Sequence, residues 1–288
     1  INYFDSNKSL FTLFTSGSTG KPKGVVHSTG GYGLYTMMTC KKQFGINENS
    51  VILTASDAGW INGHTYSLIG PLLLNATTIL VYKPTFLLDL NVLKKIIDLK
   101  ITILYLPVTL IRILKSLHYN LKIKSKYLIT LGSMGEPLAF DVGLWFSKAF
   151  SLKKKAIINT YYQTETSGVI CSPSFKDSSK KFPPGSVGSP LNRHIKILKL
   201  NKKNKKEFKI KYSWPGCMKK LLNGNKEYQK YWDKNGNFRM FDLATNSAKG
   251  IYIHGRVDDV INIRGHRIGS EEIETTLLKN KNIVEIAA

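Results

Sequence analysis

The sequence predicts an α/β fold built around a largely parallel sheet. Short apolar runs rich in β-branched residues alternate with segments whose apolar residues recur at helical spacing. Strands separated by helices in this way indicate crossover connections, which join parallel strands. The chain has 288 residues, 42% of them hydrophobic, which is enough to bury the core of one large domain or somewhat more.

The individual elements follow from these two patterns. Strands are expected at residues 10–15, 51–54, 77–82, 101–106, 127–132 and 156–162. Helices are expected where apolar side chains repeat every three or four positions, at residues 87–99, 108–118 and 138–150.

The second half of the chain has a different pattern. Residues 185–253 show short strands and turns, and residues 233–236 (Asp-Lys-Asn-Gly) are typical of a hairpin turn. Near the end, Ser270 can cap a helix that runs to about Lys279. Glu271 and Glu272 would lie in the first turn of this helix, where acidic side chains suit the helix dipole. No internal repeat is visible.

The chain is strongly basic, with 42 Lys and Arg against 19 Asp and Glu and a formal net charge of +23. Such an excess of basic residues is typical of proteins that bind nucleic acid or an anionic membrane. The lysines are mixed with asparagines, as in residues 201–206, which is typical of a solvated surface loop rather than of a basic groove. We therefore expect no nucleic-acid partner, while an anionic small-molecule substrate is compatible with the charge.

The cysteines and the apolar runs bear on the compartment. Cys40, Cys171 and Cys217 lie far apart and form no C-x-x-C pair, which argues against a disulfide framework or a zinc site. This usage fits a reducing compartment, so we expect a cytoplasmic location, with the nucleus as an additional one. No apolar run reaches the roughly 18 residues that a membrane span needs, so no membrane association is expected. Nothing in the sequence fixes an oligomeric state.

A glycine-rich string follows the first expected strand, at residues 15–24 (TSGSTGKPKG). Its glycines let backbone N–H groups approach a polyphosphate, and Lys21 and Lys23 add positive charge. A Walker loop needs four residues between its glycines and Ser or Thr after its lysine. Here two residues separate Gly17 from Gly20, and Pro22 follows Lys21. The string therefore predicts a phosphate-binding loop of another type.

This string resembles the signature phosphate loop of the adenylate-forming enzymes, which include acyl-CoA synthetases, luciferases and peptide-synthetase adenylation domains. Further blocks resemble the acetyl-CoA synthetase branch and stand in the same order. They are residues 26–32 (VHSTGGY), 57–66 (DAGWINGHTY), 70–72 (GPL), 132–137 (GSMGEP), 159–166 (NTYYQTET), 213–216 (SWPG) and 255–259 (GRVDD).

The resemblance implies the domain organisation and the reaction. Residues 1–257 would form the ATP- and acyl-binding core of a large domain of mixed sheets flanked by helices, with a small β subdomain. Residues 258–288 would hold the hinge, at Asp258, and the start of a small α+β domain. The implied activity is acetate–CoA ligation: ATP-dependent formation of acetyl-AMP with release of pyrophosphate, then thioester formation with coenzyme A, with Mg²⁺ as cofactor.

Alternatives to this activity stay open. They are a propionate-type short-chain acyl-CoA synthetase, a related enzyme that passes the acyl group to another acceptor, and a non-catalytic nucleotide-binding relative. By the same comparison the chain lacks an N-terminal part of the large domain and most of the small domain. The lysine that contacts the reacting carboxylate would lie beyond residue 288, so the chain alone is expected to bind ATP without efficient catalysis.

The resemblance also implies roles for individual residues at the phosphates. The loop residues would hold the β- and γ-phosphates: Thr15, Ser16, Gly17, Ser18, Thr19, Gly20 and Lys21. Thr164 would bind the α-phosphate and Glu165 would coordinate Mg²⁺; with Lys21 they form the expected catalytic set. A lone carboxylate beside three phosphates is repulsive unless a divalent cation bridges them, so the chemistry agrees.

Further nucleotide contacts are implied along the chain. Asp242 would accept hydrogen bonds from the ribose hydroxyls, although Phe241 precedes it where the family has Gly. The other expected ATP-binding residues are Gly135, Glu136, Pro137, Thr160, Tyr161, Tyr162, Gln163, Arg256 and Arg267. Arg264 and Gly265 would meet coenzyme A, and Arg264 stands where the family often has Ser.

The acyl pocket is expected at Trp60, Ile61, Asn62, Met134 and Tyr162. Tyr162 replaces the usual Trp and leaves more room, whereas Ile61 and Met134 are larger than the usual valines and take room away. Because one methylene is worth only about 1–3 kcal/mol, acetate over propionate is a preference. His64 is expected to line the substrate or to be structural, because a carboxylate nucleophile is already ionised at pH 7 and needs no general base.

Overall fold

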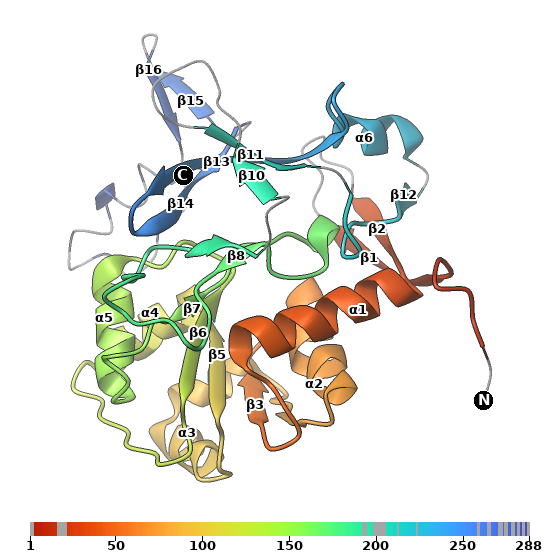
Figure 1. The fold of residues 1–288 in the computed structure, drawn as a ribbon. Helices are drawn as coiled ribbons and strands as arrows, with labels where there is room; N and C mark the ends of the chain where they lie inside the picture. Colours follow the sequence, from red (N-terminus) through yellow and green to blue (C-terminus); the bar gives the residue numbers. More distant parts are fainter. Residues whose placement is uncertain are drawn as a thin grey trace.

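The structure is a computed structural model. It describes residues 3–15, 22–191, 195–197, 206–211, 213–222, 224–257, 260–263 and 266–269, and residues 273, 276, 277, 280, 283 and 286 near the C-terminus. Figure 1 shows a lower α/β layer and, above it, the antiparallel strands of the second half of the chain.

A five-stranded parallel sheet forms the centre of the α/β layer. Its order is β4 (Thr77–Ile79), β3 (Val51–Thr54), β5 (Ile103–Pro107), β6 (Thr130–Met134) and β7 (Ile158–Asn159), and every neighbouring pair is parallel. The expected parallel sheet is thus confirmed. Each of its strands lies inside or overlaps a predicted one, with β5 and β6 ending one or two residues later than expected.

Successive side chains of β5 point to opposite faces of this sheet, and each face has its own core. Leu104 and Leu106 pack with α3 (Leu90–Ile97), α4 (Val108–Leu117) and α5 (Phe140–Ala149). Ile103 and Tyr105 pack with α1 (Thr29–Thr39), its π-helical continuation η1 (Cys40–Phe44) and a second π-helical segment, η2 (Gly63–Ile69). Short segments α2 (Gly70–Leu73) and η3 (Pro84–Leu88) complete the layer. Figure 1 shows α5 and α1 on opposite sides of the strands.

The three helices on the first face confirm the prediction, and their ends have local causes. The helix expected at 87–99 is preceded by η3 and begins after Asp89, whose carboxylate accepts hydrogen bonds from the backbone N–H groups of Asn91 (2.7 Å) and Val92 (3.3 Å). Such an N-cap contributes about 1 kcal/mol.

The remaining strands are antiparallel. One sheet has the order β1 (Ser9–Thr15), β2 (Lys23–Ser28), β12 (Lys220–Leu222), and another has the order β10 (Ile195–Ile197), β11 (Lys206–Lys211), β13 (Asn237–Ser247), β14 (Gly250–Arg256). Two-stranded pairs are β8 (Cys171–Ser172) with β9 (Ser189–Pro190), and β15 (Val260–Ile263) with β16 (His266–Gly269). The short helices η4 (Thr164–Thr166) and α6 (Asn225–Lys230) lie between them in sequence. Mixed sheets flanked by helices are therefore confirmed.

Several local features differ from the prediction. The first strand pairs with β2 in an antiparallel sheet and not with the parallel strands. Helix α1 was not expected, because its sequence TGGYGLYTMMT contains three glycines, which disfavour helix; the buried rings of Tyr32 and Tyr35 fix it to the core. The 233–236 turn is present, with Gly236 at φ +70°, but it joins α6 to β13 through a single Trp232–Phe238 bridge. Most of the helix expected from Ser270 lies outside the described residues.

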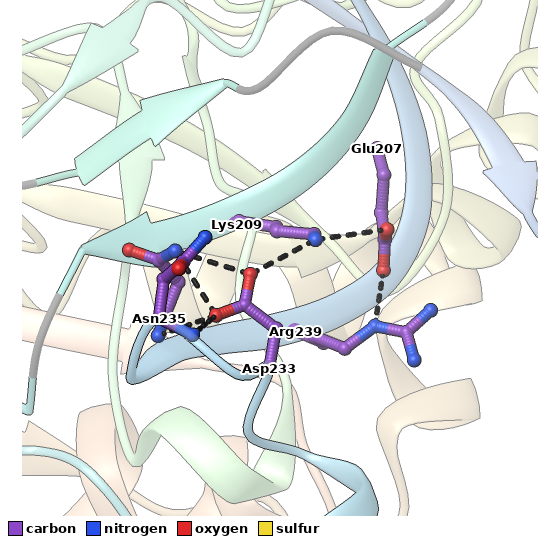
Figure 2. Close-up of polar contacts among 6 residues, drawn as sticks. Glu207, Lys209, Asp233, Asn235 and Arg239 are labelled. Carbon is purple, nitrogen blue, oxygen red and sulfur yellow. Dashed lines mark hydrogen bonds and ion pairs between the residues drawn. The ribbon is translucent and has the colours of Figure 1, made fainter. Parts of the chain in front are cut away.

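An ion-pair network fixes β11 to β13 and to this turn (Figure 2). Glu207 is buried and accepts from Nε of Arg239 (2.8 Å), while Lys209 pairs with Asp233 (3.1 Å) and approaches Glu207 (3.6 Å). Burial would raise the pKa of Asp233. Hydrogen bonds from the side chain and backbone of Asn237 and from Lys209 outweigh it and hold that pKa well below its usual range.

Among the described residues, no helix has the length and apolar character needed to cross a membrane.

Candidate functional site

The segment that follows β7 is the centre of the candidate site. Residues 160–166 leave the carboxyl end of a strand of the parallel sheet, where open α/β sheets bind their ligands. Thr160 begins the segment, and its hydroxyl is hydrogen-bonded to the hydroxyl of Tyr105 (2.6 Å) and donates to the carbonyl of Ser133 (2.9 Å). The segment is therefore anchored to two neighbouring strands before the predicted phosphate-binding residues are reached.

Thr164 and Glu165 lie in η4, which is held from three directions. The hydroxyl of Thr166 accepts from the backbone N–H of Gln163 (3.0 Å) and closes the turn. The backbone N–H of Met218 donates to the carbonyl of Glu165 (2.9 Å), and Nε2 of His27 donates to the carbonyl of Thr164 (2.8 Å). Ser167 follows at φ +58°, a left-handed conformation that ends the turn. The turn carrying the predicted α-phosphate ligand is thus tied to β2 and to the segment before β12.

His27 is fully buried on β2. Burial is the main cause that lowers its pKa to about 4; the hydrogen bond to Thr164 opposes this effect, and the nearby His64 adds to it. His27 is therefore neutral near pH 7 and keeps its proton on Nε2, because the carbonyl of Thr164 can only accept. His64, which is expected to line the substrate or to be structural, stacks on Phe11 with ring centroids 5.0 Å apart.

Glu165 is buried, and its Oε1 accepts a hydrogen bond from the hydroxyl of Tyr231 (2.7 Å). Burial and the charge of Glu165 raise the pKa of Tyr231, so this hydroxyl stays protonated. The described residues contain no cluster of three or more metal-ligating side chains. A single carboxylate nevertheless fits Mg²⁺, which is usually held by one or two carboxylates together with the substrate's phosphates.

The described residues that flank the predicted phosphate loop lie near Tyr231, the partner of this carboxylate. Its residues 16–21 are outside the described residues, but its two ends, Thr15 and Lys23, pair across β1 and β2. Nζ of Lys23 lies 5.6 Å from the centroid of the Tyr231 ring, and that ring's hydroxyl reaches Glu165. Tyr231 thus links the end of the loop at Lys23 to the predicted metal ligand.

Asp242 is brought to the same segment by an irregularity in β13. The pairing of β13 shifts register opposite Phe208, so that residues 240–242 oppose a single residue of β11. Phe241 takes φ +57° within this bulge, the left-handed region in which the family's Gly would be unstrained.

The carboxylate of Asp242 accepts from the hydroxyl of Tyr161 and from Nε2 of Gln163 (2.6 Å). Burial and the charge of Asp242 raise the pKa of Tyr161 well above its usual value. Arg256 stands opposite Asp242 on β14. Four predicted nucleotide-binding residues, two from the segment after β7 and two from the β13–β14 hairpin, therefore lie together.

The predicted acyl pocket is partly assembled. Ile61, Asn62 and Met134 are buried; the hydroxyl of Tyr162 donates to Oδ1 of Asn62, and Nδ2 of Asn62 contacts the sulfur of Met134. Trp60 is 68% exposed and stands apart from these buried side chains.

The Gly135–Pro137 loop faces helix α4. Gly135 has φ +89°, and Glu136 pairs with Arg112 and accepts from the hydroxyl of Thr109 (2.9 Å). Of the predicted site residues that the structure describes, only Pro137 lines the broad groove of about 2190 Å³ that runs along α4 and α5. That groove is therefore separate from the cluster around residues 160–166.

The other predicted site residues have no described side-chain geometry. Arg267 lies on β16 without a described side chain, and Asp258, Arg264 and Gly265 are outside the described residues. Two residues that touch the site were not predicted, His27 as a support of Thr164 and Tyr231 as the partner of Glu165.

Comparisons with known proteins agree with this picture. The family described as "AMP-binding enzyme" matches residues 2–211. The acetyl-coenzyme A synthetase of Chlorobaculum tepidum is 35% identical over 98% of this chain, and acetyl-coenzyme A synthetase 1 of Debaryomyces hansenii is 37% identical over 98%. The chain spans about 44% of the length of these two relatives.

A solved structure extends the comparison to the fold. A crystal structure of an anthranilate CoA ligase in complex with anthranoyl-AMP has a TM-score of 0.82. It is 20% identical in sequence, and the match covers 98% of this chain and 54% of that one. At this identity the likeness shows the fold alone.

Proposed function

The chain belongs to the AMP-binding enzyme family, and from this membership we propose that it carries the ATP- and acid-binding core of an AMP-forming acetate–CoA ligase. The relatives named acetyl-coenzyme A synthetase support this proposal. The observation that carries it is the convergence on residues 160–166. This segment contacts the expected ribose ligand Asp242, includes the expected phosphate and metal ligands, and places Tyr162 against Asn62 in the expected acyl wall.

In the proposed first step, a carboxylate oxygen of acetate attacks the α-phosphorus of ATP. A new oxygen–phosphorus bond forms while the bond to the β-phosphate oxygen breaks, which leaves acetyl-AMP and releases pyrophosphate. Acetate is already ionised at pH 7, so no general base is required. Both reactants are anions, and the task of the residues is to position them and to stabilise the charge that develops.

The side chains divide this work. The hydroxyl of Thr164 would donate to the α-phosphate, and the turn that carries it is held in place by His27. Asp242 would orient the ribose, and Ile61, Asn62, Met134 and Tyr162 would close around the methyl group of acetate. Glu165 would hold Mg²⁺, which neutralises phosphate charge when it is bound with ATP.

In the second step, the sulfur of coenzyme A attacks the acyl carbon and displaces AMP, and the thiol proton is lost. Arg264 and Gly265 would meet coenzyme A here. Asp258 would be the hinge between a core at residues 1–257 and the domain that begins at residue 258.

The cysteines support a cytoplasmic location. Cys40, Cys171 and Cys217 are free thiols, as is usual for proteins in a reducing compartment. Nothing supports the additional nuclear location.

The test is ATP–pyrophosphate exchange by the protein from its complete reading frame, with acetate, propionate or no acid. We expect exchange that depends on acetate, and a loss of about 100-fold in Glu165→Gln, as for removal of one group that stabilises transition-state charge. Glu227→Gln, which changes an exposed carboxylate on α6, is the matched control and should retain exchange. Exchange with propionate alone would keep the mechanism and change the acid. Absence of exchange with either acid would overturn the proposal.

A further inference from the structure

Tyr231 occupies an unusual position beside the expected metal ligand. It caps the C-terminal end of α6 and is 5% exposed, and its hydroxyl donates to Oε1 of Glu165 (2.7 Å). Glu165 and Tyr231 are 66 residues apart in the sequence. Within the described part of the chain, no lysine or arginine lies within ion-pair distance of Glu165, so the hydroxyl of Tyr231 is the group that fixes this carboxylate.

We propose that Tyr231 is a positioning residue, which holds the carboxylate of Glu165 ready for the divalent cation that accompanies the nucleotide. The inference rests on the proposed function. A glutamate side chain has three rotatable bonds, and a hydrogen bond to one carboxylate oxygen restricts them while the other oxygen remains for the cation. Outer partners of this kind orient metal ligands, and their loss typically weakens metal binding about 10–100-fold.

A tyrosine suits this task better than a basic residue would. Its hydroxyl is neutral, so it orients Glu165 and leaves the full negative charge of the carboxylate to attract the cation. Nζ of Lys23 lies over the face of the Tyr231 ring, 5.6 Å from its centroid. In that place its ammonium faces the Tyr231 ring, and it forms no ion pair with Glu165.

The ring of Tyr231 is held by β13. It stacks on Phe238, with centroids 5.5 Å apart and planes at 27°, and it meets Phe241 edge-on at 5.3 Å and 85°. The guanidinium of Arg239 lies 4.6 Å from the centroid of the Phe241 ring. This stack of Arg239, Phe241 and Tyr231 leaves the tyrosine little freedom to rotate. It also explains what the side chain of Phe241 does at a position where the family has Gly.

The test measures ATP binding by isothermal titration calorimetry, with Mg²⁺ and separately with EDTA. Tyr231→Phe keeps the ring and its packing and removes only the hydroxyl. We expect about tenfold weaker binding with Mg²⁺ and unchanged binding with EDTA. Tyr228→Phe, on the same helix and half-buried, is the matched control and should bind as the unchanged protein does. Tyr231→Gln keeps an N–H donor. We expect it to bind ATP with Mg²⁺ more tightly than Tyr231→Phe does.

A double-mutant cycle separates positioning from a general structural effect. In a Glu165→Gln background, Tyr231→Phe should cause no further loss of Mg²⁺-dependent affinity, because the charged partner is already gone. Equal binding by Tyr231→Phe and the unchanged protein with Mg²⁺, or an equal loss with EDTA, would overturn the inference and leave the proposed function intact. Failure of the unchanged protein to bind Mg²⁺–ATP would overturn both.

Discussion

His27 connects β2 to the turn that carries Thr164, and lowering the pH should test this connection directly. Its pKa is lowered from the ordinary 6.5 to about 4, because the folded protein buries the ring. Below pH 6.5 the unfolded chain takes up a proton on His27, whereas the folded chain does not until about pH 4. Acid therefore favours the unfolded state, and the stability that His27 contributes falls as the pH decreases from about 7 to about 4.

The size of this effect follows from the difference between the two pKa values. Each unit corresponds to about 1.4 kcal/mol, so His27 should account for a loss of about 2 kcal/mol between pH 7 and pH 5, and about 3 kcal/mol by pH 4. The variant His27→Gln keeps an N–H donor for the carbonyl of Thr164 and cannot titrate. Its free energy of unfolding should therefore fall about 2 kcal/mol less than that of the unchanged protein over the same pH range.

Urea unfolding at pH 7 and pH 5, followed by tryptophan fluorescence, measures both free energies. Leu114→Ala is the control, because Leu114 is fully buried on α4, on the other face of the parallel sheet. It should lower stability by about 2–5 kcal/mol at both pH values and keep the full pH dependence. If His27→Gln and the unchanged protein lose the same free energy between pH 7 and pH 5, the burial argument for His27 is wrong.

Three further predictions concern β13 and the acyl wall. Arg239→Met removes the hydrogen-bonded partner of buried Glu207 (Figure 2) and should cost about 2–3 kcal/mol in urea unfolding, whereas Lys230→Met, which breaks an exposed pair, should give no resolvable change. Phe241→Gly should be more stable than Phe241→Ala by about 1 kcal/mol, because both lose the ring but only Gly is unstrained at φ +57°; equal stabilities would contradict the left-handed conformation. Tyr162→Trp should lower the use of propionate relative to acetate about tenfold in the exchange assay, and an unchanged ratio would remove Tyr162 from the acyl wall.

The sequence was most informative about the parallel sheet. Its strands are short β-branched runs followed by helices of clear amphipathic spacing, so the pattern and the tertiary structure agree. Helix α1 was missed because its three glycines oppose helix locally, and burial of Tyr32 and Tyr35 overrides that tendency. The antiparallel pairing of the first strand with β2 was not predicted, because an apolar run carries no information about its pairing partner.

In the candidate site, too, some residues were predicted from the sequence and others were not. The ordered motif blocks identified residues 160–166 and Asp242, and the structure brings these together. His27 and Tyr231 were missed as supports of the site because their partners are 137 and 66 residues away in the sequence. A hydrogen bond between a buried side chain and a distant turn leaves no periodic pattern. His27 directly follows the apolar pair Val25 and Val26 in β2, which does not indicate its partner.

Phe241 bears on whether the chain is a catalyst or a non-catalytic relative. Replacement of the family's Gly by a bulky residue, together with Arg264, keeps the non-catalytic alternative open, because Gly permits close backbone approach. A left-handed non-glycine residue also costs about 1–3 kcal/mol. The structure shows the residue in that conformation, with its ring between Arg239 and Tyr231. Aromatic and cation–π contacts of this kind contribute about 0.5–1.5 and 0.5–1 kcal/mol, which is comparable to the strain.

The bulge that positions Asp242 is present with Phe241 in it, and the ring of Phe241 packs against Tyr231, whose hydroxyl donates to Glu165. In a chain that had lost this site, we would expect a residue at position 241 without backbone strain, or the loss of its contacts with Arg239 and Tyr231. Phe241 keeps a strained backbone conformation beside Asp242 and near Glu165, and both carboxylates keep their hydrogen bonds. Strain of this kind is typical of a functional site. The contacts of Phe241 are thus compatible with a working site.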